Sequence, residues 1–202
     1  MEPSKEHITP LEELLQAAST GNLLRIRELV LAGTSSHPSI SYATEVLRDV
    51  VEWVCTDKDP YRLDVVRTLL ELGADPNYME EDCSGPLVPA MINMDGEMIA
   101  LLLKAGADPN DPRLGGDDPP SFYDWAEFDY RFYLFDLREP EEATPEDRKD
   151  ENSWLRYLDR MAIKHDKPRP DYLFLLREYG AKTAPELRGE SGSSDHADAE
   201  TT

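Results

Sequence analysis

Cysteine, histidine and long apolar runs are scarce in this chain of 202 residues, and each shortage excludes a class of protein. Its two cysteines, Cys55 and Cys83, are too few for a disulfide scaffold, and a single pair in a reducing compartment is normally two unreacted thiols. The longest apolar stretches, such as 99–103, fall far short of the roughly 20 residues that span a bilayer. Residues 1–10 contain prolines and acidic residues, unlike a secretory signal peptide. We therefore expect a cytoplasmic protein outside any membrane.

Basic residues are also few. The chain has 21 Lys and Arg against 42 Asp and Glu, which gives a net charge of -21 and a pI near 4.4. A field of this sign repels phosphate backbones and anionic membrane surfaces, so we expect no direct binding to nucleic acid or to a membrane. Hydrophobic residues make up 40% of the chain, which is enough for a globular protein of this length to bury a core.

Side chains suited to catalysis or metal binding are sparse. The four histidines are scattered, and none stands at metal-ligand spacing from another histidine or from a cysteine: His7, His37, His165 and His196. The stretch 115–120 has two glycines, but it is acidic and would repel a phosphate. We expect a non-enzymatic protein and assign no catalytic, cofactor-binding or metal-binding residue.

The chain does contain an internal repeat. The sequence Leu-Leu-Glu-Leu-Gly-Ala-Asp-Pro-Asn at 69–77 recurs as Leu-Leu-Lys-Ala-Gly-Ala-Asp-Pro-Asn at 102–110, so Gly73 and Gly106 are 33 residues apart. Apolar residues at helical spacing precede both copies. In each copy the glycine is expected to take a left-handed conformation beyond the helix end, and the proline prevents the helix from continuing.

A repeat of this length with this ending resembles the ankyrin-repeat family. The sequence Gly-Pro-Leu-Val-Pro-Ala at 85–90 is similar to the family's opening motif Thr-Pro-Leu-His-x-Ala, with Val88 in place of the histidine. Met94 stands where the family has a glycine between two helices. The resemblance implies an all-α solenoid of about four helix-turn-helix repeats.

The spacing of equivalent residues places the repeats. Ala90 and Gly106 are 16 residues apart, an interval that recurs between Ala17 and Gly33. Between the corresponding residues of the last repeat, Ala126 and Gly180, the interval is 54 residues, so about 38 residues are inserted there. We expect an N-terminal arm at 1–10, an ankyrin-repeat domain at 11–182 with repeats at about 11–38, 39–78, 79–111 and 119–182, an insertion at about 137–169, and a disordered acidic tail at 183–202.

Aromatic residues crowd the segment 122–135. Five of them follow helical spacing and are expected to pack against the third repeat: Phe122, Trp125, Phe128, Phe132 and Phe135. The tyrosines of the segment then point elsewhere, and either the inserted segment or a partner covers them. The residues of the insertion that could do so are Trp154, Leu155, Leu158 and Met161.

The resemblance also implies a function, because ankyrin solenoids bind proteins through a concave surface lined by finger loops and inner helices. The candidate partner-binding residues are Tyr78, Met79, Glu80, Glu81, Asp82 and Ser84 in one loop, Arg113, Leu114, Asp117 and Asp118 in the next, and Tyr123, Tyr130 and Tyr133 of the aromatic segment. The acidic charge favours a basic protein partner, and we expect a monomer.

The sequence therefore predicts a protein-protein interaction module, and two alternatives remain open. The chain could be an inhibitor or immunity protein that imitates the charge of nucleic acid and blocks a basic toxin or nuclease. More remotely, it could be a hydrolase whose site is formed by the insertion. No motif names the partner, and one scaffold serves many roles.

Overall fold

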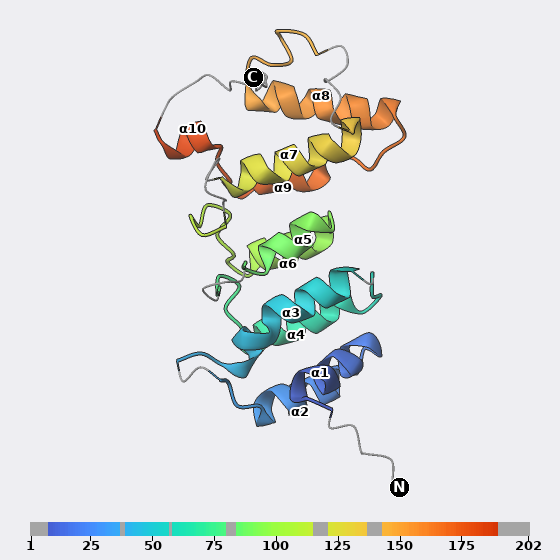
Figure 1. Ribbon diagram of the computed structural model, residues 1–202, viewed down its shortest axis with the longest axis vertical. Helices are drawn as coiled ribbons and strands as arrows, with labels where there is room; N and C mark the ends of the chain where they lie inside the picture. Colours follow the sequence, from blue (N-terminus) through green and yellow to red (C-terminus); the bar gives the residue numbers. More distant parts are fainter. Residues whose placement is uncertain are drawn as a thin grey trace, which may run out of the picture. The chain divides into compact units, whose positions relative to one another are not determined.

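The computed structural model describes residues 8–36, 39–56, 58–79, 84–114, 121–136 and 143–189. Within these ranges the chain forms ten α-helices and no β-strand (Figure 1), which confirms the prediction of an all-α protein. No helix in the same ranges is long and apolar enough to cross a membrane. The chain divides into two compact units, Met1–Asp108 and Pro109–Thr202, which we describe in turn.

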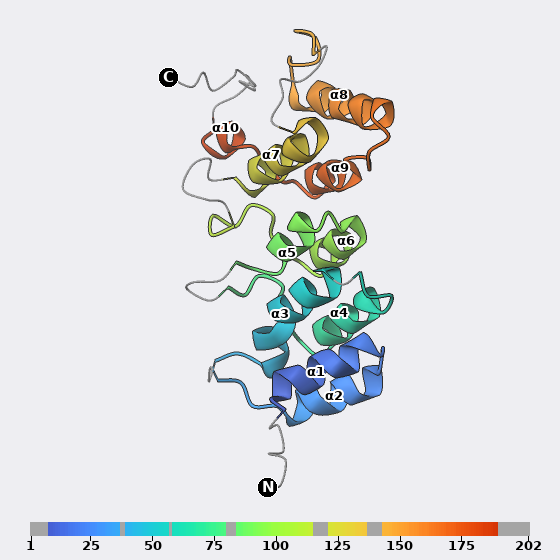
Figure 2. The ribbon, with the colours of Figure 1, turned by 45° about the vertical axis from the view of Figure 1, so that its right-hand side comes forward.

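The first unit consists of three helix pairs. They are α1 (Pro10–Ser19) with α2 (Leu23–Ala32), α3 (Tyr42–Thr56) with α4 (Arg62–Glu71), and α5 (Leu87–Ile92) with α6 (Gly96–Lys104). Helices α1, α3 and α5 lie in one row, and α2, α4 and α6 lie beside them in a second row (Figure 2). The core between the rows is aliphatic, with side chains at most 1% exposed: Leu14, Ile26, Leu47, Val50, Leu69, Met98 and Leu102.

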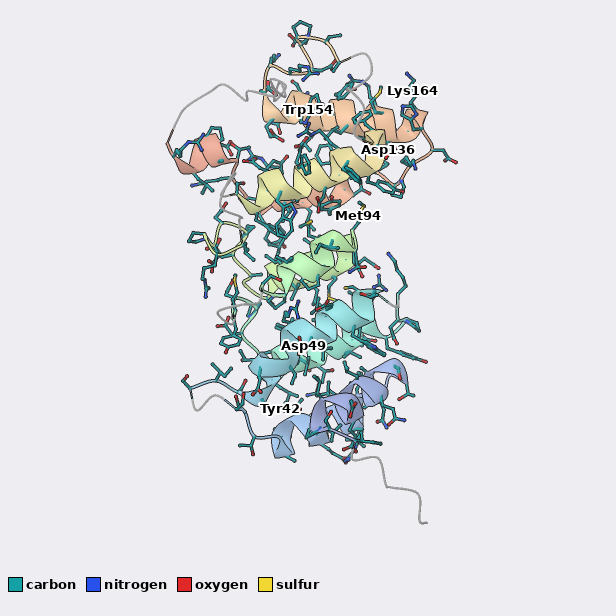
Figure 3. The ribbon with its side chains drawn as sticks, viewed as in Figure 1. Tyr42, Asp49, Met94, Asp136, Trp154 and Lys164 are labelled. Carbon is teal, nitrogen blue, oxygen red and sulfur yellow. The ribbon has the colours of Figure 1, made fainter. Side chains whose placement is uncertain are left out.

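Each pair of the first unit reverses direction through one residue with a left-handed backbone. These residues are Gly21, Lys58 and Met94, with φ angles of 63°, 54° and 50°. At Met94 the turn is closed by two backbone hydrogen bonds, from its own N–H to the Met91 carbonyl and from the next N–H to the Ala90 carbonyl. Met94, labelled in Figure 3, therefore adopts at a non-glycine residue the conformation that glycine adopts most easily.

The repeated glycines end the second helix of a pair in the predicted way. Gly73 and Gly106 follow α4 and α6 with φ angles of 88° and 98°. Gly33 differs, because its φ of -67° is ordinary extended backbone. A Cβ atom on Gly33 would lie 2.2 Å from the ring of Tyr42, so the close approach of that ring, and not the backbone angle, favours glycine there.

Two asparagines fasten these endings to one another. In the first unit the side-chain amide of Asn77 donates to the Gly106 carbonyl (2.9 Å), and its oxygen accepts from the N–H two residues further on (2.7 Å). In the second unit Asn110 makes the same two hydrogen bonds around Gly180, each 2.8 Å long. The asparagine of the repeated pentapeptide thus forms a turn and also links its helix ending to the next one by two hydrogen bonds.

The second unit contains α7 (Phe122–Phe135), α8 (Glu151–Lys164), α9 (Asp171–Glu178) and α10 (Ala184–Leu187). Helix α7 contacts both α8 and α9 (Figure 1). Helix α8 lies inside the predicted insertion, and α9 ends at Gly180 with a φ of 82°. In contrast to the first unit the core combines leucines with large aromatic side chains, and the aromatic ones are at most 1% exposed: Tyr123, Tyr130, Trp154 and Tyr157.

The predicted tail begins later than expected. Thr183 and Glu186 form a reciprocal capping box that starts α10. Helix α10 is fixed further because its first N–H donates to Asp124 of α7 (2.7 Å) and Glu186 binds Arg177 of α9 (2.6 Å). Disorder from residue 183 onward was the wrong prediction for the described residues, because these polar contacts hold a helix that has little apolar surface. Residues 190–202 lie outside the described ranges.

Candidate functional site

The first predicted finger loop is described at its two ends. Tyr78 and Met79 on one side and Ser84 on the other are partly exposed. The acidic residues between them, Glu80, Glu81 and Asp82, lie outside the described ranges. The described ends of this loop are thus open to solvent, as a contact surface requires.

The second predicted loop is only partly suited to binding. Arg113 is exposed and pairs with Asp111, its neighbour in the loop (2.5 Å). Leu114 is only 4% exposed, because burial removes its aliphatic side chain from water. A buried side chain cannot contact a partner, so the prediction that Leu114 binds one is wrong. Asp117 and Asp118 lie outside the described ranges.

Two of the three predicted tyrosines are buried. Tyr123 is 1% and Tyr130 is 0% exposed, so neither ring is available to a partner, contrary to the prediction. The Tyr130 hydroxyl donates to the Pro168 carbonyl (2.7 Å), which satisfies the polar atom within the core. Tyr133 is 37% exposed, and the Lys167 ammonium lies 4.9 Å from the centre of its ring.

The inserted segment bonds to Tyr123 and Tyr130, which agrees for these two residues with one of the two predicted possibilities, whereas Tyr133 stays 37% exposed. Trp154, Leu155 and Leu158 of α8 are 0% exposed, and Met161 is 7% exposed. Two hydrogen bonds join α8 to α7: Tyr123 bonds Glu151, and the Trp154 indole N–H donates to Glu127 (2.6 Å). Trp154 is labelled on α8 in Figure 3. The insertion is therefore part of the core of the second unit.

The structure exposes two aromatic residues that the sequence placed inside. Phe128 and Phe132 are 52% and 48% exposed. Phe122 and Phe135 of the same predicted set are buried, and the other buried residues of α7 are Tyr123, Ala126, Glu127, Tyr130 and Leu134. The signal that could have shown this was the alignment of Ala126 with Ala17 and Ala90, since both of these alanines are buried on the core side of their helices. The aligned alanine identifies the side of α7 that faces the core, whereas the spacing of the aromatic residues does not.

One stripe of α7 consequently combines aromatic and acidic side chains. We call it the α7 face, and it consists of Trp125, Phe128, Asp129, Phe132 and Asp136. Burial raises the pKa of Asp129, and a hydrogen bond from the Trp125 side chain opposes that shift. The Arg131 guanidinium lies 5.8 Å from the centre of the Phe128 ring, so this ring already receives a cation. The face can therefore offer both ring faces and carboxylates.

A polar cluster in the first unit surrounds Asp95, the N-cap of α6. Its carboxylate accepts from the Met98 N–H (3.1 Å), from Arg62 Nε (2.6 Å) and from the Cys55 thiol (3.7 Å). Burial by itself would raise the pKa of Asp95, but the hydrogen bonds from Arg62 and Met98 outweigh it and lower that pKa. Burial also raises the pKa of Cys55 to about 12, so the thiol stays protonated and is no nucleophile at neutral pH.

A second polar cluster lies between α7 and α8. Glu127 is 6% exposed, accepts from the Trp154 indole and forms an ion pair with Arg131 (2.7 Å). Burial raises the pKa of Glu127 and raises that of Glu151 to about 7. Glu151 can therefore hold a proton close to neutral pH. Tyr123 and Glu127 of this cluster are buried, at 1% and 6% exposed, whereas Glu151 is partly exposed.

Among the described residues no three His, Cys, Asp or Glu side chains are grouped as a metal site requires. Neither a protein-family model nor any of the curated proteins compared with the chain matches its sequence. The described geometry defines an all-helical protein of paired helices with an exposed aromatic and acidic face.

Proposed function

We propose that this chain is an ankyrin-type repeat protein that binds a basic protein partner and carries out no catalysis. The paired helices and the left-handed turn inside each pair of the first unit support the ankyrin-type assignment. Helix endings at Gly73, Gly106 and Gly180 support it further. The carbonyls of Gly106 and Gly180 each accept a hydrogen bond from an asparagine side chain. In such a protein the binding surface is the concave side, formed by inner helices and finger loops.

The observation that carries the proposed binding role is the exposure of Phe128 and Phe132. They stand one turn apart on α7, 52% and 48% exposed, while other aromatic residues of the same helix are buried. Large exposed aromatic residues are unfavourable in water and are typical of the centres of protein interfaces. This pair is therefore the proposed anchor.

Charge selects the kind of partner. Asp129 and Asp136 belong to the same stripe as the two rings. Arginine or lysine side chains of a partner can pair with these carboxylates and also stack on the rings. The net charge of -21 attracts a basic protein from a distance and repels an acidic one. We propose Tyr78, Met79 and Ser84 of the first finger loop as a second contact.

The proposal is tested by quantitative affinity capture with the full chain, followed by binding kinetics with each captured protein. The variant Phe128→Ser with Phe132→Ser should lose a basic partner that the wild-type protein retains. The matched control is Ile163→Ser, because Ile163 is an equally exposed apolar side chain (64%) on α8. This control should bind normally, and circular dichroism should show that all three proteins remain helical.

Salt and the finger loop provide a second test with the same partner. Association should slow as ionic strength rises, because salt screens the attraction between opposite charges. Replacing Glu80, Glu81 and Asp82 by serine should reduce the association rate and its dependence on salt. Partners that bind both variants and wild type equally well, with the same salt dependence, would refute the proposal.

An inhibitor of a basic toxin or nuclease remains a particular form of this proposal. Such a target would contact the same acidic and aromatic surface, so the identity of the captured partner separates an inhibitor from an adaptor. We do not propose a hydrolase, because the carboxyl group of Glu127 in the cluster formed with the insertion is buried and already bonded to Trp154 and Arg131.

A further inference from the structure

The contact between α7 and α8 depends on carboxyl groups at its centre. Glu151, in the first turn of α8, is bonded to the Tyr123 hydroxyl of α7. Glu127 of α7 accepts the indole N–H of Trp154 from α8 (2.6 Å). Each helix thus contributes one carboxyl group and one aromatic donor to the contact. Such an arrangement is sensitive to the number of protons it holds.

We propose that this contact is a proton-controlled latch, in which Glu151 carries a proton while the first turn of α8 is docked on α7 and releases it to solvent when that turn separates. The proposal does not depend on the proposed binding function, because it concerns the packing of the free protein.

The charged groups that face Glu151 come from three helices. Helix α7 contributes Asp124 and Glu127, which repel an ionised Glu151. Helix α9 contributes Arg177, which attracts it. This guanidinium lies 5.2 Å from the centre of the Tyr123 ring and is already bound to Glu186 of α10. Ionising Glu151 in the docked state therefore places a third carboxylate beside two others and an arginine that is already paired. The groups that face Glu151 are therefore two carboxyl groups and one arginine that also binds Glu186, and these surroundings favour the protonated form of Glu151.

The pKa values give the direction of the pH effect. Burial, opposed by the Tyr123 hydrogen bond and assisted by the charge of Glu127, raises the pKa of Glu151 from 4.5 to about 7. When the turn separates, Glu151 is solvated and its pKa returns to the ordinary value. The docked state therefore binds more protons. Docking is strongest below the ordinary pKa, weakens by up to about tenfold per pH unit between about 4.5 and 7, and is constant above that range.

Hydrogen exchange of the full chain, measured at several pH values from 5.5 to 8, tests the latch. Protection factors, corrected for the intrinsic pH dependence of amide exchange, should fall in the first turns of α8 by up to about tenfold per unit below pH 7 and then level off. The amides of α3 in the other unit are the internal reference and should not follow this course. A parallel fall in α3 would indicate global unfolding and overturn the proposal.

The variant Glu151→Gln is the decisive comparison, because the amide cannot ionise but can still bond Tyr123. Its α8 protection should be independent of pH across this range, whereas the exposed-residue control Glu178→Gln should behave as wild type. Equal pH dependence in wild type and Glu151→Gln would overturn the proposal. If Glu151→Gln fails to fold, Tyr123→Phe replaces it. Removal of the hydroxyl that favours the ionised form should move the transition to higher pH, and an unmoved transition would equally overturn the proposal.

Discussion

Asp95 in the first unit and Glu151 in the second stand at the start of a helix, α6 and α8 respectively, yet their pKa values shift in opposite directions. Asp95 accepts hydrogen bonds from Arg62 and from a backbone N–H, so the charged form is favoured despite burial. Glu151 bonds a neutral tyrosine hydroxyl and faces other carboxyl groups, so burial prevails. The position on a helix therefore does not decide the protonation state, whereas the partners that the packing supplies do.

The cores of the two units differ in a related way. Aliphatic side chains fill the first unit and bring no polar atoms with them. Tyrosine and tryptophan in the second unit each carry a donor that must find an acceptor. Tyr130 and Tyr172 use backbone carbonyls, whereas Trp154 uses Glu127. In the second unit the indole donor of Trp154 is thus matched by a buried carboxyl group, Glu127, whose pKa is raised by burial.

The largest expected effect is the loss of a large side chain from either core. Trp154→Ala should lower the free energy of unfolding by about 3–5 kcal/mol, and it also removes a donor to the buried Glu127. Leu102→Ala should cost about 2–5 kcal/mol through the cavity alone. Urea unfolding followed by circular dichroism measures both. Trp154→Phe retains most of the ring but not the N–H, so a cost as small as that of a surface substitution would contradict the importance of this hydrogen bond.

The buried ion pair of the first unit is expected to rank second. Arg62→Met should lower the free energy of unfolding by about 1.5–3 kcal/mol at neutral pH, because Asp95 loses a charged donor. Since the pKa of Asp95 is lowered in the folded state, its stabilisation is complete above the ordinary value of 3.8 and is lost as pH falls through the folded value.

This charge effect is tested by unfolding the wild-type protein and Arg62→Met at pH 6 and at pH 3. The difference in stability between wild type and Arg62→Met should shrink in acid, opposite in sign to the Glu151 effect. An undiminished difference at pH 3 would show that Arg62 acts through packing and not through the charge of Asp95.

Substitutions at two residues with a left-handed backbone should change the free energy of unfolding by smaller amounts and in opposite directions. Gly106→Val should cost about 1–3 kcal/mol through backbone strain, because φ is 98° and a Cβ atom there meets nothing within 4 Å. Met94→Gly should relieve a left-handed backbone and gain up to about 1 kcal/mol. Thermal unfolding of both variants checks the pair. A stabilising Gly106→Val would contradict the role of this glycine as a helix ending.

The smallest effect is expected at the C-terminus of the second unit. Deleting 191–202 should leave the melting temperature nearly unchanged, because this segment has no large apolar residue to anchor it. Ending the chain at Lys182 instead removes α10 and the partner of Arg177, and should cost about 1 kcal/mol. Equal melting temperatures for the two truncations would mean that α10 contributes nothing to the unit.

Local signals in the sequence were sufficient for much of the first unit. The pentapeptides at 73–77 and 106–110 placed the ends of α4 and α6, because glycine conformation and proline geometry act within a few residues. The same reasoning failed for Phe128 and Phe132. In α7 aromatic residues occupy positions all around the helix, so apolar periodicity cannot tell an inward face from an outward one.

By itself the sequence determined that the protein is helical and where α4 and α6 end. Tertiary structure alone decided that Tyr123 is buried with α8 of the inserted segment, that Phe128 and Phe132 remain exposed, and that burial raises the pKa of Glu151 to about 7. The physical reason is the range of the forces involved. Helix endings depend on backbone angles within one turn, whereas burial and pKa depend on side chains that packing brings together from distant positions.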